Sequence, residues 1–170
     1  LGELSCCDIH ANAFFIAPGW PQRLPFHRER SMTETAKAAF IEELNAALGA
    51  AVVTGEDIPA PFRHDWSGLP PVLPIALIRP RETDEVATAL RIANRHGVTI
   101  VPQGGLTGLA GGAQPVAGGA VLSLDRMSGI EEIDPVMASI TVKAGTPLEV
   151  VQKAADEAGL FLGIDLGARG

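Results

Sequence analysis

The spacing of apolar residues predicts a first helix over residues 33–48. Phe40, Leu44 and Leu48 recur every four residues, which places them on one face of a helix. Gly49 follows directly and is typical of a residue that ends a helix. One face of this segment is therefore expected to be buried.

The same spacing predicts a second helix that ends at Gly97. Val86, Leu90 and Ala93 form its expected buried stripe. Thr83 is the expected N-cap, because its hydroxyl can accept a hydrogen bond from a free N–H of the first turn. Acidic residues follow it directly and favour the positive end of the helix dipole.

Short apolar runs on either side of the second helix predict strands. Residues 51–54 and 74–78 precede this helix, and residues 98–101 follow it. A proline-rich segment, 58–66, separates the first two runs and is expected to be irregular. The order strand, helix, strand is that of a parallel βαβ unit. Its last strand leads straight into a glycine-rich loop, at the carboxyl end where open α/β sheets bind ligands.

The pattern of predicted elements changes after the glycine-rich loop. Residues 120–124, 129–133 and 139–143 predict short strands with tight turns, so we expect this half to be mostly antiparallel. Thr146 and Glu149 predict a capping box that begins a third helix. The predicted fold class is α+β: a small parallel βαβ subdomain followed by a mostly antiparallel sheet with helices. The domain is expected to be incomplete at its C-terminus.

The segment 102–112 reads Pro-Gln-Gly-Gly-Leu-Thr-Gly-Leu-Ala-Gly-Gly and lies in a run without charged side chains from Gly97 to Leu124. Glycines let successive N–H groups converge on an anion, because no Cβ atoms stand in the way. A nucleotide diphosphate is the expected ligand. It would be held by backbone dipoles and the Thr107 hydroxyl, since no lysine or arginine is near.

Two common nucleotide-binding motifs do not fit this loop. It lacks the lysine of a nucleoside-triphosphatase phosphate loop. The spacing Gly104–Leu109 lacks the third glycine of a Rossmann fingerprint, and helix signals do not follow it. Leu106, Leu109 and Ala110 are interleaved with the glycines. They predict a buried wall rather than a flexible surface loop.

Composition narrows the class of partner. The chain has 170 residues and a net charge of −7, which argues against nucleic acid, because clustered lysine and arginine carry that affinity. No apolar run approaches the ~20 residues that span a bilayer. Cys6 and Cys7 are adjacent and cannot form a disulfide framework, so a cytoplasmic location is predicted, with peripheral membrane association as its alternative.

Residues 1–31 differ from the rest of the chain and are expected to be a disordered or non-native tail, with Met32 as the native start. The remaining residues, 32–170, form the predicted binding domain. Cys6, Cys7 and His10 are not expected to bind a metal, because adjacent cysteines rarely satisfy tetrahedral geometry. No metal site is predicted.

Several phrases, in the same order along the chain, closely resemble a known family. Residues 101–113 resemble the pyrophosphate loop of the PCMH-type FAD-binding domain, also called the vanillyl-alcohol-oxidase type. Further resemblances are in residues 65–66 and 76–86 (entry strand and first helix), 122–127 (the strand after the loop) and 164–170 (the segment leading to a second flavin-contacting loop). Together they resemble the branch that contains D-2-hydroxyglutarate and D-lactate dehydrogenases. The likeness covers roughly residues 40–170.

The resemblance implies a set of residues that bind FAD. The cofactor-binding residues it implies are Pro102, Gly104, Gly105, Leu106, Thr107, Gly108, Leu109, Gly112, Ala113, Asp165 and Leu166. The last two would flank the adenosine or flavin side, and Leu106 stands where the family often has Gly or Asn. Noncovalent FAD is implied, because no histidine or cysteine lies between Gly97 and Gly170.

The resemblance also implies an activity: oxidation of a D-2-hydroxy acid by hydride transfer to the flavin, with the electron acceptor unknown. A glycolate oxidase subunit and an alditol oxidase of the same fold are alternatives. A non-catalytic fragment and a non-flavin nucleotide-binding module are alternatives of other classes. No catalytic residue is predicted. His64 could act as a base oriented by Asp65, but a structural role is favoured for this histidine. His96 suits the end of a helix and is also interpreted as structural. The isolated chain is expected to be inactive.

Overall fold

The computed structural model describes residues 32–167 of the chain. The predicted tail 1–31, with Cys6, Cys7 and His10, lies outside the described residues, as does the end of the chain from residue 168. Among the described residues, no helix has both the length and the apolar character needed to cross a membrane.

The first two helices were predicted correctly in position. Helix α1 spans Glu34–Leu48, and the Thr33 hydroxyl accepts a hydrogen bond from the Ala36 N–H at 3.2 Å. Helix α2 spans Thr83–His96 and ends at Gly97, whose left-handed backbone (φ 64°) suits glycine. The prediction of Thr83 as N-cap is wrong, because Thr83 is already helical.

Glu82 and Glu85, and not Thr83, form the N-terminal end of α2. Glu82 is the N-cap residue, and its side chain makes no capping hydrogen bond. The Glu85 carboxylate reaches back instead and accepts a hydrogen bond from the Arg81 N–H at 2.6 Å. The beginning of α2 is therefore set by a carboxylate inside the helix, where negative charge also complements the helix dipole.

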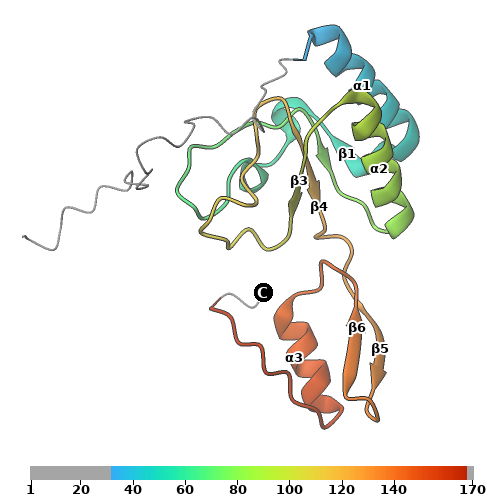
Figure 1. Cartoon of the computed structure of the whole chain (residues 1–170), viewed down its shortest axis with the longest axis vertical. Coiled ribbons are helices and arrows are strands. Elements are labelled where there is room, and N and C mark those ends of the chain that lie inside the picture. The colour runs from blue at the N-terminus through green and yellow to red at the C-terminus, as the bar shows by residue number, and fades with distance from the viewer. Residues whose placement is uncertain (1–31, 168–170) are drawn as a thin grey trace, which may run out of the picture. The chain divides into compact units, whose positions relative to one another are not determined.

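Four strands form one sheet in the order β1-β2-β4-β3 (Figure 1). They are β1 (Val52–Val53), β2 (Leu77–Ile78), β3 (Ile100–Gln103) and β4 (Ala120–Ser123). Strand β4 is parallel to both β2 and β3, and β1 is antiparallel to β2. The prediction that the chain becomes antiparallel directly after the glycine loop is thus wrong for β4, because this strand returns to the centre of the first sheet.

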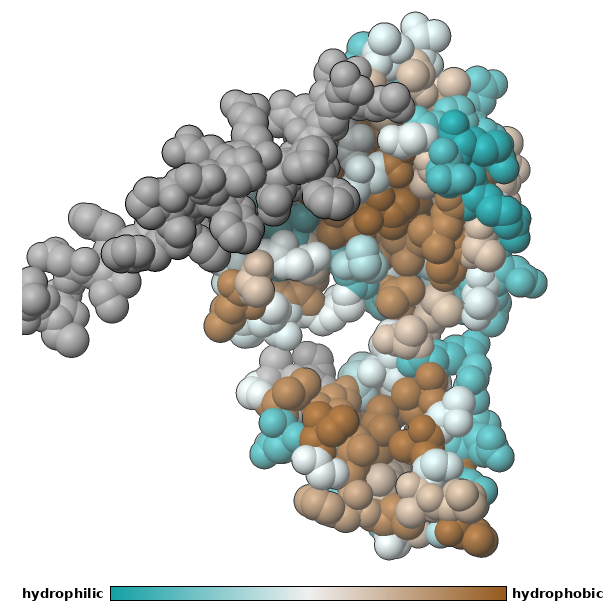
Figure 2. All heavy atoms as spheres, in the orientation of Figure 1, coloured by the Kyte–Doolittle hydropathy of each residue, from teal (hydrophilic) through white to brown (hydrophobic). Residues whose placement is uncertain are grey.

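The larger hydrophobic core lies between this sheet and the two helices. Its buried residues are Phe40, Leu44, Ala76, Ile78, Ala89, Ile92, Ala93, Val98, Ala120 and Leu122. Burial of a large apolar side chain of this kind contributes about 1.5–3 kcal/mol. Figure 2 shows hydrophilic residues on the outward side of the helices and hydrophobic residues beside the strands. Leu90, predicted in the buried stripe, is 47% exposed, because Ala89 and Ile92 face the core in its place.

The opposite face of the sheet has a much smaller core. Leu77 and Val121 alternate with residues of the larger core and point to this side, where they pack with Ile58. Phe62, from a short 3-10 helix at Ala60–Arg63, covers them in part. This face is covered mainly by irregular segments, as the proline-rich sequence predicts.

The chain after β4 contains the antiparallel pairing that was predicted. Strands β5 (Ile130–Asp134) and β6 (Ser139–Val142) form a two-stranded sheet, and α3 (Leu148–Glu157) follows. The predicted capping box is wrong, because the Thr146 hydroxyl is used elsewhere. It donates to the Lys143 carbonyl at 2.6 Å and accepts from the Gly129 N–H at 3.0 Å, so it fixes a turn.

Candidate functional site

The glycine loop lies at the carboxyl end of the parallel strands. It begins after β3 and is the first part of the connection 104–119, which returns the chain to β4 (Figure 1). β3 and β4 are direct neighbours and parallel, paired from Ile100 with Ala120 to Gln103 with Ser123. A helix usually joins parallel neighbours, but here an extended loop does so. Its backbone polar groups are therefore not consumed by a helix.

At four of the loop glycines, neither the backbone conformation nor the packing of the described residues requires a glycine. Gly104, Gly105, Gly108 and Gly112 have no left-handed backbone, and a Cβ built on any of them meets no atom of residues 32–167 within 4 Å. Gly111 is different, because its φ of 77° and the Leu69 side chain at 3.2 Å both favour glycine. The four glycines therefore keep open a space along the backbone that the described protein does not fill.

The N–H groups of this loop are available as donors. Among the described residues, none of the N–H groups of residues 104–112 donates a hydrogen bond to the protein. The loop is held by a carbonyl instead, since the Trp66 N–H donates to the Leu106 carbonyl at 3.2 Å. Free N–H groups on an open, charge-free backbone suit an anion that approaches closely. A nucleotide diphosphate fits this donor set.

Leu106 is strained within the loop. Its φ is 60°, a left-handed conformation that costs a residue with a Cβ roughly 1–2 kcal/mol. The prediction of a buried wall is wrong for two of its three residues, because Leu109 is 76% exposed and Ala110 is also exposed. Leu106 is half-buried. The loop is a surface feature of this chain, which leaves its N–H groups accessible.

Ala113, at the end of the glycine motif, is held at both polar atoms of its backbone. Its N–H donates to Asp65 Oδ2 at 3.3 Å, and its carbonyl accepts from Gln103 Nε2 at 2.9 Å. Both side chains are buried, with 4% of Asp65 and 1% of Gln103 exposed. Sequence reasoning missed Gln103. The signal was a single amide at the end of an apolar strand, directly before the glycines.

Gln103 carries a buried oxygen without a partner. Its Nε2 also donates to the Phe62 carbonyl at 3.3 Å, so two carbonyls fix the orientation of the amide. Its Oε1 is left buried and makes no hydrogen bond in the described part of the chain. Such a group costs about 1–3 kcal/mol.

The Asp65 carboxylate is held by neighbouring donors. The Ser67 hydroxyl and the Ser67 N–H both donate to Oδ1, the latter at 3.0 Å. These hydrogen bonds, with the Ser67 hydroxyl first, lower the pKa of Asp65 below its ordinary value of 3.8 against the opposing effect of burial. The His64 ring lies 3.2 Å from the Asp65 carbonyl and not from its carboxylate. The pair considered as a base and its orienting acid is therefore not formed.

His96 has the structural role that was expected. Its Nε2 lies 2.7 Å from Glu43 Oε2, and its ring packs edge-on against Phe40. The histidine, followed by Arg95, lowers the pKa of Glu43. These contacts join α1 to the last turn of α2. Within residues 32–167, no group of three or more potential metal-ligating residues comes together.

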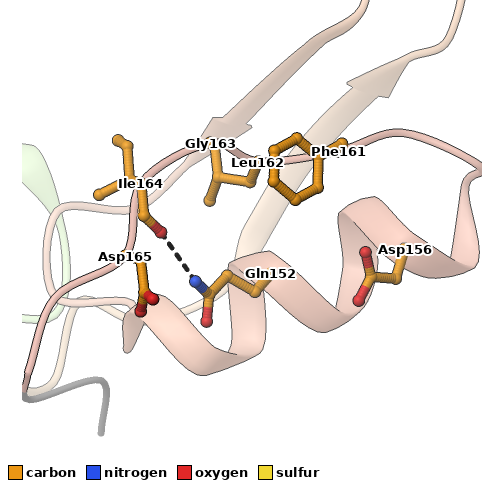
Figure 3. A pocket seen from close by; sticks show the side chains of 7 residues that line it. All are labelled: Gln152, Asp156, Phe161, Leu162, Gly163, Ile164 and Asp165. Carbon is orange, nitrogen blue, oxygen red and sulfur yellow. Dashed lines mark hydrogen bonds between the residues drawn. The ribbon is translucent and has the colours of Figure 1, made fainter.

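Asp165 and Leu166 lie on the segment that follows α3. Gln152 of that helix donates from Nε2 to the Ile164 carbonyl at 2.8 Å and holds the segment near the helix (Figure 3). The pocket between them is lined by Gln152, Asp156, Phe161, Leu162, Gly163, Ile164 and Asp165. Its described lining includes the carboxylates of Asp156 and Asp165. The structure establishes no contact between this segment and the glycine loop among the residues it describes.

The architecture matches solved flavoproteins. A structure of p-cresol methylhydroxylase with substrate bound aligns with a TM-score of 0.66 and 24% identity, over 76% of this chain and 26% of that one. The fold is therefore that of the PCMH-type flavoprotein domain, the α+β class predicted from the sequence.

Sequence comparison identifies the family. The family described as "FAD binding domain" matches residues 74–170, and the chain belongs to it. The D-2-hydroxyglutarate dehydrogenase of Xanthomonas citri pv. viticola is 42% identical over 115 residues, which cover 66% of this chain and 24% of the relative. The mitochondrial D-2-hydroxyglutarate dehydrogenase of Danio rerio is 32% identical over 150 residues, 88% of this chain and 27% of the relative. The chain thus spans about a quarter of the length of these curated relatives.

Proposed function

We propose that this chain supplies the FAD-binding part of a flavin-dependent oxidoreductase that oxidises a D-2-hydroxy acid. The cofactor follows from the family. The substrate class is inferred from the names of the relatives, which are D-2-hydroxyglutarate dehydrogenases. When bound, FAD would supply the redox chemistry as acceptor of a hydride from the substrate, and the protein would supply binding and orientation.

The observation that carries the proposal is the open backbone of Gly104, Gly105, Gly108 and Gly112. No atom of the described residues occupies the positions their side chains would take, and in the same part of the chain the neighbouring N–H groups make no hydrogen bond to the protein. A diphosphate can therefore approach the backbone closely. Lysine and arginine are absent from Gly97 to Leu124, so the N–H groups and the Thr107 hydroxyl supply the attraction.

The residues proposed to hold FAD form two sets. The diphosphate set comprises Pro102, Gly104, Gly105, Leu106, Thr107, Gly108, Leu109, Gly112 and Ala113. Asp165 and Leu166 are proposed to flank the adenosine or flavin side. Binding is proposed to be noncovalent, because the chain has no histidine or cysteine from Gly97 to Gly170.

The test is retention of flavin by the full 170-residue chain. The purified chain is mixed with FAD and freed of unbound cofactor, and its visible flavin absorption and flavin fluorescence are recorded. We expect a retained flavin band with quenched fluorescence. A chain that is folded by circular dichroism and retains no flavin would contradict the proposal that these residues suffice for binding.

A matched pair of variants tests the loop. Gly105→Asp places a negative charge against the proposed diphosphate, where like charges 4 Å apart repel by about 1–4 kcal/mol. We expect a loss of FAD affinity of about tenfold or more, since each 1.4 kcal/mol is about tenfold. Ala117→Asp adds the same charge at an exposed position of the same connection, outside the glycine motif, and should bind FAD normally.

His64 and Asp65 are the described residues that were considered as a catalytic base. The His64 ring lies near a backbone carbonyl, and the Asp65 carboxylate is occupied by Ser67 and Ala113. Neither is placed as a free base at the loop. We expect that the chain alone, loaded with FAD, does not reduce a dye with D-2-hydroxyglutarate or D-lactate. Measurable reduction with either acid would contradict this expectation.

A further inference from the structure

The glycine loop is closed by the side chain of the residue that precedes it. Gln103 is the last residue of β3, and its main chain leads directly into Gly104. Its side-chain Nε2 donates to the Ala113 carbonyl, at the other end of the glycine motif, at 2.9 Å. Both ends of the loop are thus tied to one residue. We call this arrangement the Gln103 clasp.

The clasp rests on fixed parts of the fold. Gln103 pairs with Ser123 in the sheet, and its Nε2 is shared with the Phe62 carbonyl at 3.3 Å. On the other side, Asp65 Oδ2 accepts the Ala113 N–H at 3.3 Å. The position of Ala113 is therefore set from two directions by buried side chains. Among the described residues, the other hydrogen bonds of this loop are accepted by two of its carbonyls, that of Leu106 from Trp66 and that of Gly111 from Gln114.

One atom of the Gln103 amide adds nothing to the clasp, because no described residue bonds to the buried Oε1. A methionine at this position would have a similar length without a buried polar oxygen. The chain instead keeps an amide that satisfies two carbonyls and leaves its own oxygen without a hydrogen bond. A buried polar group without a partner calls for an explanation, and a functional role is one explanation.

We propose that Gln103 is a positioning residue of the FAD site. Its side chain holds the two ends of the glycine loop at the spacing in which the N–H groups converge on the diphosphate. The loop then loses less freedom when the ligand binds, and affinity rises through preorganisation. This inference rests on the proposed function, because it names the residue that shapes the same site.

The test compares Gln103→Met with Gln114→Met in the full chain. Gln114 is a matched control, because its amide also makes two hydrogen bonds, to the Pro70 carbonyl at 2.8 Å and from the Asp65 N–H at 3.2 Å. Its side chain makes no hydrogen bond to Ala113 among the described residues. FAD dissociation constants are measured by flavin fluorescence, and apparent stability by thermal unfolding without FAD. Limited proteolysis, with sites read by mass spectrometry, reports on residues 104–112.

We expect Gln103→Met to lower FAD affinity at least tenfold while its unfolding temperature stays near that of the wild type. Loss of the buried oxygen offsets loss of the two hydrogen bonds. Proteolytic cleavage within residues 104–112 should increase, because exposed loops that are not tied down are the preferred sites of nicking. Gln114→Met should retain most of its FAD affinity even if its unfolding temperature falls.

Three results would overturn the inference. Folded Gln103→Met with wild-type FAD affinity would remove the positioning role and leave the proposed function intact. A parallel loss of affinity and unfolding temperature in both variants would reduce Gln103 to an ordinary structural residue. If the wild-type chain itself binds no FAD, the proposal that these residues suffice for binding fails. Equal cleavage of wild type and Gln103→Met would reject the clasp separately. Should Gln103→Met not fold, Gln103→Asn, whose shorter amide cannot span both carbonyls, replaces it with the same expected outcomes.

Discussion

Gly145 lies so close to Leu124 that a Cβ at this position would stand 1.8 Å from the Leu124 carbonyl oxygen. The Gly145 N–H donates to the Met127 carbonyl at 2.8 Å, so the backbone is held in this contact. The obstructing atoms are main-chain atoms and cannot rotate away. This glycine is therefore required by packing, whereas the open glycines of the loop are not.

The contrast between Gly145 and the open loop glycines predicts that the same substitution, glycine to alanine, lowers stability at one position and FAD affinity at the other. Gly145→Ala should lower the free energy of unfolding by about 3 kcal/mol or more, because the backbone must shift to admit the methyl group. Gly108→Ala, whose Cβ meets no atom within 4 Å, should change it by less than about 0.5 kcal/mol and yet weaken FAD binding. Urea unfolding and FAD titration measure the two quantities. Equal stability of the two variants would contradict the distinction.

Leu106→Asn should stabilise the chain. Asparagine adopts the left-handed backbone of this position (φ 60°) more readily than leucine, so a gain of roughly 1 kcal/mol in the free energy of unfolding is expected. The hydrogen bond from Trp66 uses the Leu106 carbonyl and is unaffected. Leu109→Asn is the control, since Leu109 has no left-handed backbone and should show no gain. A destabilised Leu106→Asn chain would show that side-chain packing outweighs the backbone strain.

Asp65 should make stability depend on pH in the acid range. Its pKa is lowered in the folded chain, chiefly by the Ser67 hydroxyl, so the folded state favours the ionised form. This contribution is fully present above the ordinary value of 3.8 and is lost as pH falls through the lower folded value. We expect Asp65→Asn to unfold at a lower temperature than the wild type at neutral pH, with the difference shrinking below pH 3.8. Circular dichroism melts across the acid range measure this. A difference that does not depend on pH would show that the charge is not its source.

FAD affinity should depend only weakly on salt. The glycine loop lies in a run without charged residues, so no lysine or arginine of the loop itself gives up counterions. We expect the dissociation constant to change less than about threefold between about 0.05 and 0.5 M sodium chloride, because screening acts mainly on paired full charges. Fluorescence titrations at several salt concentrations measure it. A steep loss of affinity would indicate a cationic partner outside the loop.

Much of the fold was predictable because local signals determined it. Gly49 and Gly97 mark the ends of the first two helices, and the apolar spacing gave their positions. The errors occur where a residue has two possible partners. Thr146 carries a capping signal, but its hydroxyl bonds to Gly129 and Lys143 of the adjoining turn.

Long-range relationships were less accessible. The central, parallel position of β4 depends on pairing with strands far away in sequence, which periodicity does not encode. In the site, the glycines and their open backbone were predicted. The roles of Gln103 and Asp65 were not, because the Ala113 peptide that they share lies ten or more residues from each.

The unequal cores on the two faces of the first sheet have a consequence for the motions of the chain. The helical face is closed by a large cluster that includes Phe40, Leu44 and Ile92, whereas the described part of the chain buries a core of just Ile58, Leu77 and Val121 on the other face. A region with few buried apolar contacts opens at lower free energy than the rest of a domain. The irregular face should therefore exchange its amide hydrogens through local openings while the helices stay protected. Ligand binding should then slow amide hydrogen exchange on that face at ligand concentrations too low to change the unfolding temperature of the chain.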